Sequence, residues 1–182
     1  MGATLVTLTA SRSVPMKRLL VPVLALALSG CGFHLREAVQ LPSDLGPVRV
    51  VSSDPYSPLG EALSEAMTRA GAVPADPKES VGVATLEVIS ERWGDIPISL
   101  DQYGRAQEFS LRYAVIFALR GANGKDVVPQ QAIELTRDYV APAADAVGKA
   151  SEHELLAKEM RRDMAAAVMR RIDAVSRKIN AK

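Results

Sequence analysis

The spacing of apolar residues predicts a helix over 58–70. An apolar residue recurs there at every third or fourth position, so the apolar side chains share one face of a helix. Ser57 is a suitable N-cap, Pro58 suits the first helical position, and Gly71 can end the helix. We therefore expect an amphipathic helix whose buried stripe consists of Leu59, Ala62, Leu63, Ala66, Met67 and Ala70.

A second, longer stripe predicts a helix at the end of the chain. Its members are Leu156, Met160, Met164, Val168, Ile172, Val175 and Ile179, and they recur at helical spacing. Ser151 and Glu154 have the spacing of a capping box, so we expect this helix to begin near Ser151. Arginines and lysines crowd its other face, but acidic residues lie among them. Packing on a core is therefore the interpretation, in preference to lying on a membrane.

Alternating apolar and polar residues predict strands in the middle of the chain. The alternation is clearest over 105–120, where one face carries Phe109, Leu111, Tyr113, Val115, Phe117 and Leu119. A turn over 121–126 leads to a returning antiparallel strand over 127–140. Pro129 lies near the start of that strand and suits an edge of the sheet, because proline donates no ladder hydrogen bond.

Two further strands are predicted over 48–51 and 81–89, which are rich in β-branched residues. The polar stretch 93–104 contains two glycines and a proline, and we expect it to be a connection. The element order is then β-α-β-β-β-α. This order predicts an α+β fold in which two helices pack on one face of a four-stranded, mostly antiparallel sheet.

The first thirty residues have the pattern of a signal peptide. Lys17 and Arg18 precede an apolar run over 19–28, which is too short to span a membrane. Small residues then lead to a cysteine, and the cleavage motif is Leu28, Ser29, Gly30 and Cys31. We expect residues 1–30 to be removed. Because Met16 directly precedes the basic pair, translation is predicted to begin there.

Cys31 is expected to carry the lipid of a bacterial lipoprotein. Its position at the cut would let the thiol take a diacylglycerol and the freed amine take an N-acyl chain, and more than one chain gives a stable anchor. An ordinary buried cysteine is the alternative. We divide the mature chain into a lipidated tether over 31–47 and a single α+β domain over 48–182.

Composition and motifs exclude several functions. Without residues 1–30 the chain has 19 basic and 21 acidic residues, so it lacks the charge of a nucleic-acid binder. The chain has a single cysteine, so no internal disulfide can form. His34 and His153 have no partners at metal-ligand spacing, and no catalytic triad or phosphate-binding loop is evident. We predict neither an enzyme nor a bound metal or cofactor, apart from the covalent lipid.

The start of the predicted mature chain carries a specific resemblance. Residues 31–36 read Cys-Gly-Phe-His-Leu-Arg, and this run resembles the start of the LptE (RlpB) family of lipopolysaccharide-assembly lipoproteins. Weaker matches are Pro58-Leu59, Gly104-Arg105-Ala106-Gln107-Glu108-Phe109 and Lys158-Glu159-Met160. The family fold of two helices on a four-stranded sheet agrees with the order inferred above.

The resemblance implies a location in the cell envelope and a function. Such lipoproteins plug the outer-membrane β-barrel LptD, assist its assembly and bind lipopolysaccharide for delivery to the cell surface. Gly32 fits sorting to the outer membrane, facing the periplasm. Family positions for lipopolysaccharide contact fall on Lys149 and on Gln102, which is not basic, so Arg105 nearby is the candidate there. For Arg105 and Lys149 the alternative is a solvated surface charge, and for the whole protein it is an anchored lipid or small-molecule carrier.

Overall fold

The structure is a computed structural model that describes residues 39–79, 81–140 and 146–181, with side chains from residue 150 onward in the last range. Six elements follow one another: β1 (Val48–Ser52), α2 (Pro58–Arg69), β2 (Ala84–Leu100), β3 (Ala106–Arg120), β4 (Asp126–Val140) and α3 (Ala146–Asn180). The expected signal peptide and Cys31 lie outside the described residues and stay predictions.

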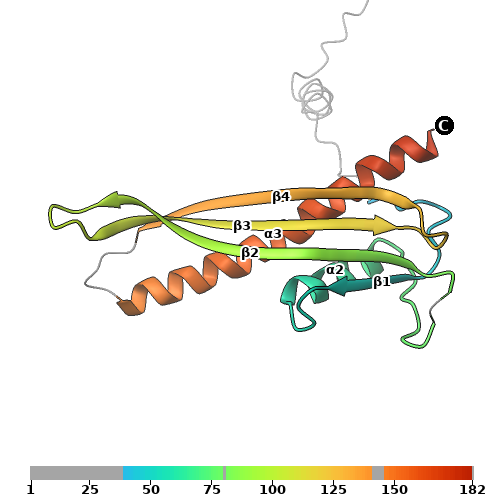
Figure 1. The fold of residues 1–182 in the computed structure, drawn as a ribbon, viewed down its shortest axis with the longest axis horizontal. Helices are drawn as coiled ribbons and strands as arrows, with labels where there is room; N and C mark the ends of the chain where they lie inside the picture. The colour runs from blue at the N-terminus through green and yellow to red at the C-terminus, as the bar shows by residue number, and fades with distance from the viewer. Residues whose placement is uncertain (1–38, 80, 141–145, 182) are drawn as a thin grey trace, which may run out of the picture. The chain divides into compact units, whose positions relative to one another are not determined.

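The sheet has the order β1-β2-β3-β4. The crossover through α2 makes β1 parallel to β2, and the two hairpins make the other pairs antiparallel. Both helices cover the same face of the sheet, behind it in Figure 1. The predicted α+β fold, with its element order, is therefore confirmed.

Local sequence signals explain α2 well. The Ser57 side chain accepts a hydrogen bond from the Leu59 amide at 3.2 Å, as expected of an N-cap, and Pro58 is the first helical residue. Gly71 follows the helix with φ of +92°, a conformation that favours glycine. Three residues of the predicted stripe are fully buried: Leu59, Leu63 and Met67.

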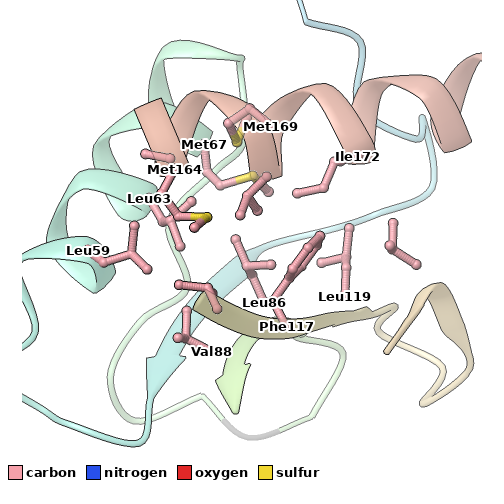
Figure 2. Packing of buried hydrophobic residues seen from close by; sticks show 14 of the residues in the cluster. Leu59, Leu63, Met67, Leu86, Val88, Phe117, Leu119, Met164, Met169 and Ile172 are labelled. Atoms are coloured by element: carbon pink, nitrogen blue, oxygen red, sulfur yellow. The ribbon is translucent and has the colours of Figure 1, made fainter. Parts of the chain in front are cut away.

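The core lies between the helices and the sheet. Figure 2 shows the labelled side chains of α2 and α3 pointing toward those of β2 and β3. The predicted inner face of β3 is buried from Leu111 to Leu119, and the α3 stripe is buried from Met160 to Ile172. Ile179, the last residue of that stripe, is 45% exposed, so the stripe extends beyond the buried core.

Two expectations about element ends were wrong. The stretch 93–104 is not a connection, because β2 continues to Leu100 and pairs with β3 along this length. Pro97 is tolerated because β1 ends its pairing at Val88, which leaves that edge of β2 open. The α3 helix begins at Ala146 and not near Ser151, which is an exposed residue inside the helix.

Part of the expected tether lies against the domain. Leu45 is only 5% exposed, and Val39 and Leu41 pack against the core. The Gln40 amide donates a hydrogen bond of 2.8 Å to the Asp173 carboxylate near the end of α3. Residues before 48 therefore contribute to the packed structure.

Candidate functional site

A β-bulge in β2 determines which side chains of β2 face the helices in the half of the sheet that follows the bulge. Val88 pairs with Phe117 and Ser90 with Ile116, so Ile89 is the extra residue. The bulge reverses the inward and outward positions that follow it. As a result Glu91, Trp93 and Asp95 share the helix-covered face with the apolar residues of β3.

Glu91 joins the start of α2 to the sheet. One carboxylate oxygen accepts a hydrogen bond from the Ser57 hydroxyl at 2.5 Å, and the other accepts from the Tyr113 hydroxyl at 2.8 Å. Burial, together with the Glu91 carboxylate, raises the pKa of Tyr113. Tyr113 therefore stays protonated and remains a donor at any physiological pH.

The next inward residue, Trp93, joins the sheet to α3. Its ring stacks on Tyr113 with centroids 3.7 Å apart, and the Arg161 guanidinium lies 5.2 Å from its centroid. A cation over an indole face is favourable, and more so when both groups are shielded from water. This contact accounts for one of the arginines that the sequence placed on the polar face of α3.

Asp95 forms a second contact between the sheet and α3. It accepts a hydrogen bond from the Tyr139 hydroxyl at 3.2 Å, and its other oxygen lies 3.3 Å from His153 Nε2. Burial and the neighbouring Asp95 carboxylate raise the pKa of Tyr139 to about 12. His153, read from sequence as a helix-start residue without ligands, is thus a half-exposed partner of β2.

Arg105 lies in the turn that joins β2 and β3. Its Nε forms an ion pair of 2.8 Å with Asp101, whose other oxygen accepts from the Arg105 amide at 2.9 Å. The Tyr103 amide also donates to Asp101, and the Arg105 guanidinium lies 5.3 Å from the Tyr103 ring centroid. The hydrogen bond from the Arg105 amide is the main cause that lowers the pKa of Asp101 to about 2. Arg105 is therefore an exposed cation held in place by its own turn.

Exposed apolar side chains lie in the same hairpin as this cation. Ile98 is 50% exposed, Leu100 is 63% exposed and Tyr103 is 72% exposed. A fixed cation beside apolar side chains suits an amphiphile that carries a phosphate or carboxylate. Lys149, the other candidate, lies in the first turn of α3, one turn before His153, and its side chain is outside the described residues.

The outer face of the sheet carries charges of both signs, and several of them form ion pairs. Arg120 lies 2.9 Å from Glu87 and 3.6 Å from Asp126, and Arg112 lies 3.7 Å from Glu134. These exposed ion pairs add little stability. They do leave a surface on which no single sign of charge prevails.

Hollows on the domain are grooves at its surface. The groove between α2 and α3 has a volume of about 620 Å³ and is lined mainly by alanines, with Arg69 and Arg162 at its sides. In the part of the chain that the structure describes, no three His, Cys, Asp or Glu side chains gather so as to hold a metal ion. Among these residues, no helix combines the length and the apolarity that a membrane span requires.

Comparison with known proteins places the chain in a family. The family model described as "LptE: Lipopolysaccharide-assembly" matches residues 45–172. The LPS-assembly lipoprotein LptE of Pectobacterium atrosepticum is 30% identical over 161 residues, which cover 85% of each chain. The protein of the same name from Photorhabdus laumondii is 28% identical over 159 residues, or 85% of this chain and 83% of its relative.

Solved structures agree with the sequence relatives. The crystal structure of rare lipoprotein B from Shewanella oneidensis has a TM-score of 0.62 at 29% identity and covers 75% of this chain and 98% of its own. A lipoprotein B from Nitrosomonas europaea, solved by NMR, has a TM-score of 0.60 at 27% identity, with coverage of 79% and 91%. The chain therefore belongs to the LptE family of lipopolysaccharide-assembly lipoproteins, which are non-enzymatic components of lipopolysaccharide transport.

Proposed function

We propose that this protein is the lipid-anchored subunit of the outer-membrane lipopolysaccharide translocon, where it plugs the LptD β-barrel and assists its assembly. The observation that carries the proposal is the family match over 45–172, joined to the lipoprotein motif at Cys31. The protein would face the periplasm and deliver lipopolysaccharide without performing a reaction on it.

The anchor is the first part of the proposal. Cys31 would carry a diacylglycerol on sulfur and an acyl chain on its amine, and each buried CH₂ contributes about 0.8 kcal/mol to membrane binding. Intact mass measurement of the protein extracted from membranes should show cleavage after Gly30 and added mass on Cys31. An uncut leader, or an unmodified thiol in the native protein, would overturn this part.

The charged surface of the sheet supports the proposal that the domain plugs a barrel. Walls of a barrel lumen are polar, so a domain that sits inside one should present mixed charges on the surface that meets them. The ion pairs of Arg112 and Arg120 on the outer face of the sheet are of this kind. A lipid carrier would instead need an enclosed apolar cavity, whereas the α2–α3 groove is partly open and large side chains fill the core.

Co-purification tests the plug. The full chain, tagged at its C-terminus and extracted in mild detergent, should bring down a large β-barrel in a constant ratio. The Cys31→Ala variant, which lacks the anchor, serves as the comparison for membrane targeting and should appear in the soluble fraction. Recovery of the acylated wild-type protein alone, from membranes that contain the barrel, would overturn the proposed partner.

Lipopolysaccharide contact is assigned to Arg105 and Lys149. The ion pair with Asp101 uses Nε of Arg105, so the terminal guanidinium nitrogens are the donors that we assign to a lipopolysaccharide phosphate. Loss of one charge-assisted contact costs about 1.4 kcal/mol or more, so Arg105→Ala should weaken binding about tenfold. Lys149→Ala should have a similar effect.

A matched variant separates the cation from its turn. Asp101→Asn weakens the turn but keeps the charge of Arg105, so it should bind lipopolysaccharide more tightly than Arg105→Ala does. Titration of purified protein with fluorescent lipopolysaccharide measures all three variants. Equal binding by Arg105→Ala, Lys149→Ala and the wild type would assign both residues to the solvated surface.

A further inference from the structure

The outer edge of β4 is an open strand edge. This strand ends the sheet, and its residues 131–140 pair with β3 without a bulge. Within the described ranges no strand pairs with its other side. An open edge presents a row of backbone N–H and C=O groups to which another strand can add.

The usual protection of an edge is confined to the start of β4. Pro129 and the adjacent change of register interrupt the edge there, between Val128 and Gln131. Residues 131–140 include no proline, glycine or lysine. Two of their charges already have partners in the domain, because Glu134 pairs with Arg112 and Arg137 pairs with Asp163 at 2.9 Å.

A groove runs beside this edge, between β4 and α3. It has a volume of about 390 Å³ and is lined by Ala132, Ile133, Glu134, Leu135, Ala167, Arg170 and Arg171. Arg170 and Arg171 are exposed, and the ion pairs found among the described residues include neither of them. The groove thus joins an open backbone edge to two exposed arginines for which no ion pair is found among the described residues.

We infer that the β4 edge receives an extended segment with acidic side chains from the barrel partner, as a fifth strand. This inference rests on the proposed function. Alternate side chains of an added strand point toward the same face, so acids at every second position would meet Arg170 and Arg171. All strands of a closed barrel are already paired, so the segment must be a loop or a terminal extension of the partner.

The positive charge of Arg170 and Arg171 favours an acidic segment over other extended segments. A basic segment would meet two exposed arginines and be repelled. A second copy of this chain would bring the acids Glu134 and Asp138 together with Arg137 and two more exposed arginines, so it offers fewer acids for each arginine than an acidic segment does. Acidic side chains would instead gain charge-assisted hydrogen bonds with both guanidinium groups.

Amide hydrogen exchange of residues 131–140 tests the inference. In the free full chain, amides that point outward from β4 should exchange quickly. In the detergent-extracted complex with the barrel, the same amides should exchange at least tenfold more slowly, because they then donate to the added strand. If the barrel co-purifies but β4 exchanges as in the free chain, this inference is overturned while the proposed function stands.

Other outcomes identify other occupants. Protection already present in the free monomer would assign the edge to another segment of this chain, and protection that grows with concentration would assign it to a second copy. Either result overturns the inference. If no barrel co-purifies with the wild type, the proposed function itself fails.

Charge reversal tests the role of the arginines. The double variant Arg170→Glu, Arg171→Glu should lose the protection of β4 in the complex, or lose the complex. Lys158→Glu is the matched control, because Lys158 is exposed on the opposite flank of α3. Thermal melting of the free variants verifies folding. Unchanged protection in the double variant would overturn the acidic occupant.

Discussion

Replacement of Glu91 by glutamine should destabilise the domain more than its partly shielded position suggests. The carboxylate accepts from the Ser57 hydroxyl at 2.5 Å and from the Tyr113 hydroxyl at 2.8 Å, and both donors are buried. A glutamine amide offers one accepting oxygen, so one of the two donors must turn to find another partner.

The magnitude follows from the change of charge. Hydrogen bonds to a charged group contribute about 1.5–3 kcal/mol, and neutral ones about 0.5–1.5 kcal/mol. Loss of the charge at two bonds should therefore lower the free energy of unfolding by about 2 kcal/mol. For a domain of this size that is a fall of about 6 °C in Tm.

The single tryptophan reports the transition. Trp93 stacks on Tyr113, so denaturant unfolding followed by its fluorescence monitors the region next to the substitution. Glu65→Gln is the control, because the exposed ion pair of Glu65 with Arg69 contributes well under about 1 kcal/mol. Equal midpoints for Glu91→Gln and Glu65→Gln would refute the reasoning. In the Glu91→Gln background, Tyr113→Phe should also cost less than it does in the wild type.

Three further predictions concern stability. Met164→Asp places an unpaired charge at a fully buried position and should unfold the domain. Ile179→Asp, at a 45% exposed position, should change the free energy of unfolding by less than about 0.5 kcal/mol. Circular dichroism distinguishes the two variants. Burial opposes ionisation of Asp173, but hydrogen bonds from the Gln40 amide and Arg177 outweigh it and lower its pKa from 3.8. The stabilising contribution of Asp173 is therefore present above pH 3.8 and lost as pH falls through the lowered pKa. Asp173→Asn should consequently lose less stability than the wild type does as the pH is lowered. Equal losses of stability in the two proteins at acid pH would contradict this. Gly104→Ala should cost about 1 kcal/mol because φ is +75°, while Gly94→Ala, at an open position with ordinary φ, should cost less in the same melting assay.

The fold could be predicted from the sequence where each element carries its own local signal. The stripe from Leu59 to Met67 lies between a cap and a glycine, so α2 could be located to within a residue. Alternation from Phe109 to Leu119 identified the inner face of β3. Both predictions succeed because period and burial agree over several turns or residue pairs.

The outer half of β2 could not be predicted, because its local signals contradict its surroundings. Gly94 and Pro97 are typical of loops, yet they lie in a strand whose edge is open beyond Val88. Whether that edge is open depends on where β1 ends in the folded sheet. A pattern of single residues does not contain this information.

The contacts of the candidate site are long-range, and this explains why sequence reasoning missed them. Asp95 and His153 are 58 positions apart and meet only because α3 begins at Ala146, five residues before the apparent capping box. One signal in the sequence is the adjacent apolar pair Val88 and Ile89, which breaks the alternation where the bulge lies. Arg105, by contrast, was named from the family resemblance, and its role in ligand contact stays a prediction.

The bulge explains why the two halves of the sheet differ. Before it, Leu86 and Val88 meet buried methionines and leucines, so apolar burial holds the helices to the sheet. After it, Trp93 and Asp95 contact Arg161 and His153 of α3, and Glu91 contacts Ser57 at the start of α2, so polar and aromatic contacts add to the attachment of both helices. Contacts of this kind are partly solvated, and each contributes less than a buried apolar side chain does. We therefore expect the half of the domain that carries Arg105 to open at a lower free-energy cost than the buried core beside α2.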